Sequence, residues 1–177
     1  MIGIPVGWAY GHVAEWALHR YLLHGPGRKR ASMWSFHFHD HHATTRTSEF
    51  QDPMYESHPF KWNAAGKEVL SLAALAAAHL PLIPVAPFFV ATVAVSGVQY
   101  YRIHKRSHLE PEWARANVPW HYDHHMGPDQ HKNWGVRRDW VDRLMGTREV
   151  YVGTEREERD IRRRAERALR KMRKQAA

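Results

Sequence analysis

Histidines dominate the residues of this chain that can do chemistry. The densest group lies in Trp120–Gly127, where three imidazoles stand at positions i, i+3 and i+4 and so share one face of a helix. Four groups hold 11 of the 15 histidines: His19 and His24; His37, His39, His41 and His42; His104 and His108; and His121, His124 and His125. Imidazoles gathered in such number need a common partner for their lone pairs, and a first-row transition metal is the natural one.

The absence of cysteine limits the metal ligands to nitrogen and oxygen. Neutral imidazoles suit iron, zinc, copper or nickel, and more than six of them indicate two metal ions rather than one. Two redox-active ions can share the reduction of dioxygen and generate an oxidant for an unactivated C–H bond, which zinc cannot do. The alternatives are a hydrolytic metalloenzyme and a non-catalytic metal-binding or storage protein. The sequence has no His-Glu-x-x-His motif, which argues against the hydrolytic reading.

The first histidine pair follows an apolar N-terminal segment. His19 and His24 are five residues apart, roughly 140° around an α-helix. They therefore share a site only if the helix ends or distorts between them. Residues that weaken the prediction of a helix in this segment are Gly3, Pro5, Gly7 and Gly11.

The second group lies on a predicted short helix over residues 34–42. On it His37 and His41 share one face, whereas His39 lies on the opposite one. Residues 43–59 have no helical period and predict a structured loop over the site. Its polar candidates for a role are Arg46, Asp52 and Tyr55.

An uncharged stretch over residues 69–101, interrupted by three prolines, predicts a hydrophobic hairpin. Its arms are expected at residues 64–80 and 87–101, each at or just below the ~17 residues needed to cross a bilayer. A buried hairpin in a soluble bundle is the alternative, but the arms are apolar all round and flanked by aromatic residues, which favours a membrane. Basic residues follow the second arm, which favours the cytoplasmic side. The expected fold is an all-α integral membrane helical bundle with a cytosolic, histidine-rich metal-binding cap.

The formal net charge of +8 is concentrated near the C-terminus. A net charge of +7 falls within residues 159–174, so the rest of the chain is close to neutral. We expect a catalytic domain over residues 1–153 and a basic helical tail over residues 154–177. A narrow apolar stripe in the tail predicts contact with an anionic leaflet. The tail has no aromatic residue to stack on bases, so a nucleic-acid partner is not expected.

The order of these motifs resembles the fatty acid hydroxylase and sterol desaturase superfamily of integral membrane enzymes. The resemblance covers about residues 8–148 and rests on His-x4-His, a His-His box, His-x3-His, His-x2-His-His and a closing Asp-x-x-Met-Gly-Thr. It implies two non-haem iron ions at the cytosolic face of a membrane, for which zinc can substitute in purified protein. It also implies a lipid substrate, hydroxylation or desaturation with dioxygen, and a separate electron-donor protein. Small carotenoid hydroxylases of the same superfamily are the alternative.

The resemblance also implies a set of metal ligands. Carried over onto this sequence, they are His19, His24, His41, His42, His104, His108, His121, His124 and His125. The family's second box has a histidine three residues before His41, where this chain has Phe38, so the tenth ligand is His37 or His39. We favour His37, because it lies on the same helix face as His41. Candidates to accept a ring N–H from a ligand histidine are Glu15, Asp40 and Asp123.

Overall fold

The computed structural model describes residues 2–176, and every regular element in that range is a helix. In chain order they are α1 (Gly3–Leu18), the π-helical turn η1 (His19–Leu23), η2 (Pro26–Arg28), the π-helix η3 (Phe36–His42), α2 (Ala43–Thr47), η4 (Pro53–Glu56), α3 (Ala64–Ala78), η5 (Leu80–Leu82), α4 (Pro87–Leu109), α5 (Pro111–Asn117), α6 (Pro119–Met126), α7 (Trp140–Leu144) and α8 (Glu155–Ala176). The all-α class predicted from the sequence is confirmed.

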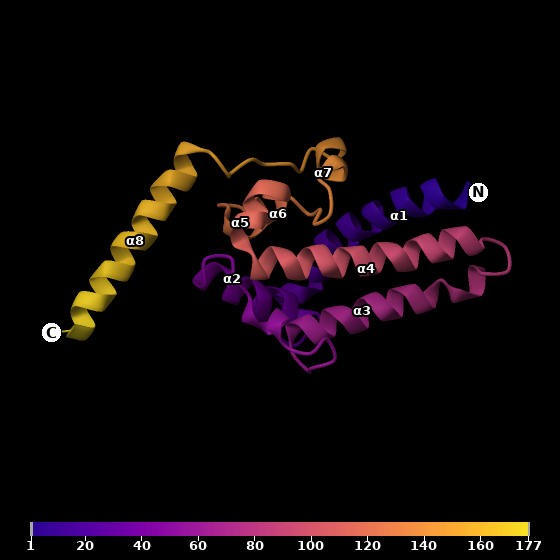
Figure 1. Cartoon of the computed structure of the whole chain (residues 1–177), viewed down its shortest axis with the longest axis horizontal. Coiled ribbons are helices and arrows are strands. Elements are labelled where there is room, and N and C mark those ends of the chain that lie inside the picture. The colour runs from indigo at the N-terminus through magenta and orange to yellow at the C-terminus, as the bar shows by residue number, and fades with distance from the viewer. Residues whose placement is uncertain (1, 177) are drawn as a thin grey trace.

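Three long helices form the body, with α4 lying between α1 and α3 (Figure 1). The glycines of α1 explain how closely α1 approaches α4. A Cβ atom at Gly7 would lie 2.9 Å from the Thr92 Cβ and 3.0 Å from the Phe89 carbonyl oxygen, and one at Gly11 would lie 2.7 Å from the Ser96 hydroxyl. The glycines that weaken the helix prediction are therefore the residues that let the two helices touch, as small residues do wherever backbones pack closely.

The predicted hairpin is present as α3, the short turn η5 and α4. The Asn63 side chain caps α3 by accepting a hydrogen bond from the Gly66 amide at 3.0 Å, and Pro87 occupies the first turn of α4. Among residues 2–176, however, no helix combines the length and the apolar character that a bilayer crossing requires. The predicted membrane-spanning arms are therefore not supported.

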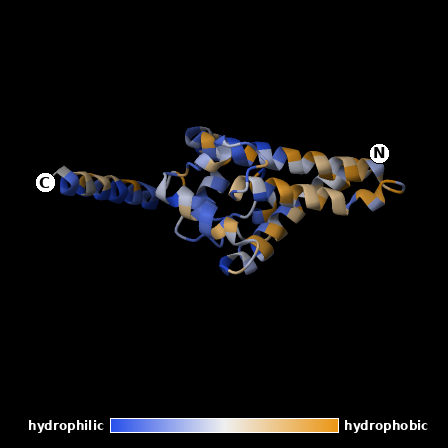
Figure 2. Cartoon of the chain, turned by 90° about the horizontal axis from the view of Figure 1, so that it is seen from below, coloured by the Kyte–Doolittle hydropathy of each residue, from blue (hydrophilic) through white to orange (hydrophobic). Residues whose placement is uncertain are grey.

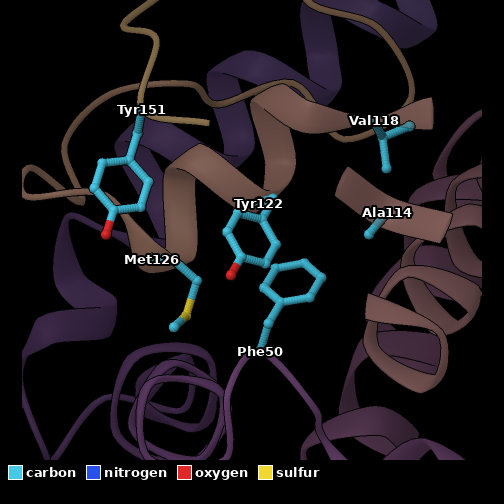
Figure 3. Close-up of a cluster of buried hydrophobic side chains, with 6 residues drawn as sticks. All are labelled: Phe50, Ala114, Val118, Tyr122, Met126 and Tyr151. Carbon is cyan, nitrogen blue, oxygen red and sulfur yellow. The ribbon is translucent and has the colours of Figure 1, made fainter. Parts of the chain in front are cut away.

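The histidine-bearing half of the molecule has its own apolar core, shown in Figure 3. This core joins the loop after α2 to α5, α6 and the segment before α8, and its buried members are Phe50, Ala114, Val118, Tyr122, Met126 and Tyr151. It fixes α6 beside the end of α4, so that the histidines of the two helices meet. The region predicted as loop, residues 43–59, contains α2 and η4, because helical geometry continues past the second histidine group without a break.

Helix α8 projects away from the rest of the molecule (Figure 1). Its first turns are attached: Glu157 is 2% exposed and pairs with Arg115 of α5, and the Tyr151 hydroxyl donates to Asp160 at 3.2 Å. Beyond these contacts its apolar side chains are exposed, among them Leu169 and Met172. The division into a catalytic domain over residues 1–153 and a tail over residues 154–177 stays a prediction, as does the contact of the tail with an anionic leaflet.

Candidate metal centre

Two compact groups of buried histidines lie side by side. Site A, as we name the first, contains His19, His24, His37, His42 and His124, and site B contains His41, His104, His108 and His125. Within each group, one potential ligand atom of every residue lies within 4.8 Å of those of all the others. His121 adjoins site B, with its Nε2 atom 3.0 Å from Nε2 of His108. The structure thus brings together all ten histidines selected from the sequence, with His37 in the position that the sequence left open.

The ring nitrogens of site A converge on one point. The Nε2 atom of His37 lies 3.0 Å from Nε2 of His19 and 3.2 Å from Nε2 of His42. The Nε2 atom of His42 also lies 3.1 Å from that of His24 and 3.2 Å from that of His124. Two imidazoles bound at right angles to a metal through bonds of about 2.1 Å have their nitrogens about 3.0 Å apart. The observed separations therefore match the edges of a coordination polyhedron.

Hydrogen bonds on the opposite side of the rings decide which nitrogen carries the proton. The Nδ1 atom of His19 donates to the Trp134 carbonyl at 2.7 Å, and that of His124 donates to the Lys132 carbonyl at 2.6 Å. Since a carbonyl only accepts, both protons reside on Nδ1 and both Nε2 atoms present lone pairs to the centre of site A. Lone pairs cannot bond to one another, so these nitrogens need a cation between them.

Site B is built in the same way. His108 donates its Nδ1 proton to the Phe50 carbonyl at 2.9 Å. The Thr45 hydroxyl donates to the His42 carbonyl at 3.0 Å, so it accepts at 3.0 Å from Nδ1 of His125. The Nε2 atoms of His41, His104 and His125 are buried and have no hydrogen-bond partner in the described chain. Buried nitrogens without a partner are costly, and a bound metal would satisfy them.

The two sites share their supporting elements. His41 and His42 are adjacent in η3, yet the first belongs to site B and the second to site A. Helix α6 likewise gives His124 to site A and His125 to site B, and the rings of His42 and His125 stack with centroids 4.1 Å apart. Two ions held by these sites would therefore be neighbours, which is the arrangement of a dinuclear centre.

The π-helical turns bring histidines five residues apart onto one side. The His24 amide donates to the His19 carbonyl at 3.0 Å, the i→i+5 bond of a π-helix, and the two rings are 5.1 Å apart. His37 and His42, also five apart, lie in η3 with their rings 4.8 Å apart. This is the distortion that the spacing of His19 and His24 requires.

The family model described as fatty acid hydroxylase matches residues 4–147. The chain belongs to the fatty acid hydroxylase family. The superfamily resemblance predicted from the histidine spacing is therefore confirmed, and the match ends with the Thr147 of the Asp-x-x-Met-Gly-Thr motif. No curated protein and no solved structure gives a significant match to the chain.

The Asp-x-x-Met-Gly-Thr motif positions His19 indirectly, through the backbone of Trp134. The Asp142 carboxylate accepts from the Thr147 hydroxyl at 2.7 Å, from the Trp134 amide at 2.8 Å and from the Gly135 amide at 2.8 Å. The Trp134 carbonyl in turn accepts from His19. The motif thus holds the backbone that orients a site A imidazole, and its turn depends on the positive φ of Gly146, +66°.

Burial keeps the imidazoles neutral before metal is bound. It lowers the pKa of His19 to about 3 and lowers the pKa values of His37, His42, His108, His121, His124 and His125 well below their ordinary range. Neighbouring histidines add to this effect, because a second positive charge in the same cluster would repel the first. The lone pairs are therefore free for a metal at physiological pH.

Two carboxylates accept ring protons from site B histidines. Asp52 accepts from Nδ1 of His41 at 2.7 Å, and Glu68 accepts from Nδ1 of His104 at 2.9 Å. The Tyr55 hydroxyl donates to Glu68 and lies 3.0 Å from Nδ1 of His104. Tyr55 also lines the cavity described below. Asp52 and Tyr55 were candidates from the sequence. Glu68 was missed, because a single acid at the start of an apolar helix gives no signal until the fold places α3 beside α4.

The three carboxylates predicted for this role have other partners. Glu15 accepts from the Val136 amide at 2.5 Å and pairs with Arg137 at 2.6 Å. Asp123 accepts from the Val152 amide at 2.7 Å and pairs with Arg148 at 2.7 Å. Asp40 is exposed. The structure therefore corrects this prediction: Glu15 and Asp123 hold backbone segments in place, since adjacency to a histidine in sequence does not turn a carboxylate toward its ring.

His39 lies outside both sites, and its Nε2 atom is 2.9 Å from the Arg28 carbonyl. Of the other loop candidates, Arg46 donates to the carbonyls of His125 at 2.7 Å and Gly127 at 3.1 Å. It thereby closes the C-terminal end of α6 and stabilises the helix that serves both sites.

An apolar cavity of about 280 Å³ leads to the histidines. It lies between α1 and α3 with α4 as its floor, and apolar residues in its wall include Leu18, Leu22, Leu72, Leu75 and Val93. At one end its wall contains His19 and His37 of site A and His41 of site B. The volume is close to the lower end of the range for ligand pockets, about 300 Å³. An apolar molecule in this cavity would therefore reach the edge of both sites.

Replacing His124 with Ala should remove metal from site A, because it deletes one of five convergent nitrogens. We expect metal analysis of the purified variant to show about half of the wild-type metal content. His39→Ala is the matched control and should retain full occupancy, since His39 lies outside both sites. Full metal content in His124→Ala would contradict the assignment.

Replacing Asp52 with Asn should weaken metal retention by about 10- to 100-fold, because a neutral amide no longer stabilises the His41 ring in the ligating tautomer. The measurement is the chelator concentration that removes half of the bound metal. Asp40→Asn, which alters an exposed carboxylate one residue before His41, should leave this concentration unchanged. Equal retention in wild-type protein and Asp52→Asn would exclude a role for Asp52 in the site.

Proposed function

We propose that the protein is a dinuclear non-haem iron oxygenase that hydroxylates, or desaturates, a C–H bond of a lipid such as a fatty acyl chain. The observation that carries this proposal is the apolar cavity whose wall contains histidines of both sites. A hydrocarbon chain fits such a cavity, and at the end where the wall contains His19, His37 and His41 it would lie next to the metal ions. Membership of the fatty acid hydroxylase family supports the same chemistry.

Iron suits the donor set better than zinc. Five histidines converge in site A, whereas structural zinc sites are almost always four-coordinate. When bound, a pair of iron ions would supply the reduction of dioxygen, which also takes two electrons from a donor and two protons. Hydroxylation puts one oxygen atom into the C–H bond and releases the other as water, whereas desaturation removes two hydrogen atoms from the chain and releases both oxygen atoms as water. The proposal therefore includes a separate electron-donor protein, because the chain has no cysteine for an iron–sulfur cluster.

The chain's own residues hold and shield the reacting partners. Leu22 and Phe36 line the cavity near the histidines and keep water from the substrate. Asp52 and Glu68 hold the protons of His41 and His104 on Nδ1, which leaves the Nε2 atoms for the metal. The protein thus contributes orientation and a dry site, and the reactive chemistry belongs to the metal.

The proposal is tested by oxygen consumption of the iron-loaded chain with a lipid extract and a chemical reductant. We expect oxygen uptake that needs lipid, together with a lipid product that is heavier by one oxygen atom or lighter by two hydrogen atoms in the mass spectrum. The zinc-loaded chain is the matched control and should consume none. Oxygen uptake with no change in any lipid would contradict the proposal, and so would equal turnover by the zinc form.

We also propose that the protein associates with a membrane through the end of the body farthest from sites A and B. Figure 2 shows hydrophobic residues gathered at the end where α3 and α4 join, beside the N-terminus of α1. Side chains exposed there include Ile2 at 81%, Val85 at 80% and Phe88 at 52%. A contiguous exposed apolar surface of this kind marks a membrane or protein contact. With basic Arg102, Lys105 and Arg106 near the other end of α4, the proposal places the histidines on the cytoplasmic side.

A wash of isolated membranes with sodium carbonate tests the membrane proposal. The full chain should stay in the pellet, because burial of apolar side chains holds it by about 0.8 kcal/mol per CH₂ group. A Val85→Glu, Phe88→Glu variant should be released in larger amount, whereas the same change at exposed Arg28 and Arg30 should not increase release. Complete release of the wild-type chain would overturn this part of the proposal.

A further inference from the structure

The apolar cavity contains one polar region, formed where α1, α4 and the segment after α6 meet. Tyr100, Ser96, Glu15 and Arg137 all belong to the cavity wall, and each of them is buried. The Glu15 carboxylate pairs with Nε of Arg137 at 2.6 Å. The rest of the wall is largely apolar, apart from the end near the histidines, which also contains Glu68. The polar region therefore divides the cavity into a part near the metal sites and an apolar part beyond.

Two hydrogen-bond donors of this region have no partner. The guanidinium Nη1 atom of Arg137 is buried without a hydrogen bond to any residue among 2–176. The Tyr100 side chain, 9% exposed, lines the cavity, and its hydroxyl makes no hydrogen bond to another residue of the described chain. A buried donor without a partner, such as Nη1 of Arg137, costs free energy comparable to a lost hydrogen bond, and an oxygen atom in the cavity would accept a hydrogen bond from such a donor.

The charges in this region favour a neutral partner. The positive charge of Arg137 is balanced by Glu15 at 2.6 Å, so a second carboxylate would enter a region that is already neutral. Burial raises the pKa of Tyr100 well above its ordinary value, and Glu68 and Glu15 raise it further, so the phenol keeps its proton and donates it. A carbonyl or hydroxyl oxygen accepts such hydrogen bonds without adding charge.

The polar region lies about one helical turn from the metal sites. Tyr100 precedes His104 by four residues on α4, and the two rings are 5.4 Å apart. Glu15 of α1 precedes His19, the first residue of η1, by four residues. Four residues span about 6 Å along a helix. An oxygen bound here would therefore leave a short piece of chain between itself and the carbon that reaches the histidines.

We infer that Tyr100 and Arg137 bind a neutral oxygen atom of the substrate, a carbonyl or hydroxyl, and so select an oxygen-bearing lipid over a pure hydrocarbon. This inference rests on the proposed function, because it names the class of lipid that the same cavity takes. It also sets the position of oxidation, close to the oxygen rather than at the far end of the chain. A polyene hydrocarbon of the carotene type has no atom that satisfies these donors.

The experiment measures equilibrium binding of three probes with equal chain length to the full metal-loaded chain without reductant, so that no probe is oxidised. The probes are hexadecane, methyl hexadecanoate and the hexadecanoate anion. Each is compared between wild-type protein and Tyr100→Phe in the same vesicles, so that differences in membrane partition cancel. Tyr101→Phe is the matched control, because the neighbouring tyrosine has no place in the cavity wall.

Tyr100→Phe should lower the affinity for the methyl ester about fivefold, the loss of one hydrogen bond, and leave the affinity for hexadecane unchanged. Tyr101→Phe should change neither. Equal loss for both probes, no loss for the ester, or no binding of any probe would overturn the inference, as would a greater loss for the anion than for the ester. Because no turnover is measured, an ester-specific loss in a chain that oxidises no lipid would refute the proposed function and leave this inference standing.

Discussion

The rest of this structure depends on one constraint: the lone pairs of several buried imidazole nitrogens face one another. Backbone carbonyls take the Nδ1 protons of His19, His124 and His108, and this leaves Nε2 atoms facing one another at about 3 Å. Such an arrangement is unfavourable without cations between the rings. The surrounding chain therefore has to hold ten rings rigidly enough that metal binding, rather than rearrangement, relieves the repulsion.

The elements around sites A and B hold the histidine rings in place. Asp52 and Phe50 lie in one loop, and the first orients His41 while the second orients His108. Asp142 fixes the Trp134 backbone, which orients His19 from the other side. The short apolar core around Phe50 and Tyr122 then keeps α6 against α4 (Figure 3). Most of this support comes from residues far from the histidines in sequence. The direct contacts of Asp52, Phe50 and Trp134 with the rings are hydrogen bonds that a neutral imidazole can satisfy only in one tautomer.

The same fold leaves room for an apolar substrate. Helix α4 supports both α1 and α3, and the space between those two helices is the cavity that ends at His19, His37 and His41. The small residues Gly7 and Gly11 let α1 lie directly on α4, so the cavity has a floor of α4 side chains rather than a gap between helices. Helix α4 thus contributes both to the cavity wall and, through His104 and His108, to site B, which fits the proposed reaction, in which one C–H bond must be selected among many similar ones.

Much of the chemistry follows from the sequence by itself. The ten histidines that cluster, the all-α class, the hydrophobic hairpin and the family were predictable, because helical periodicity and box spacing are local and the absence of cysteine excludes thiolate donors. The tertiary structure alone decided which ring enters which site, since adjacent residues such as His41 and His42 point to different sites. It also decided that Glu68 rather than Glu15 accepts a ring proton from a clustered histidine, and that Tyr100 and Arg137 both line the cavity. Those choices depend on contacts between elements distant along the chain, and nothing in the local pattern of residues specifies which way a buried carboxylate or phenol turns.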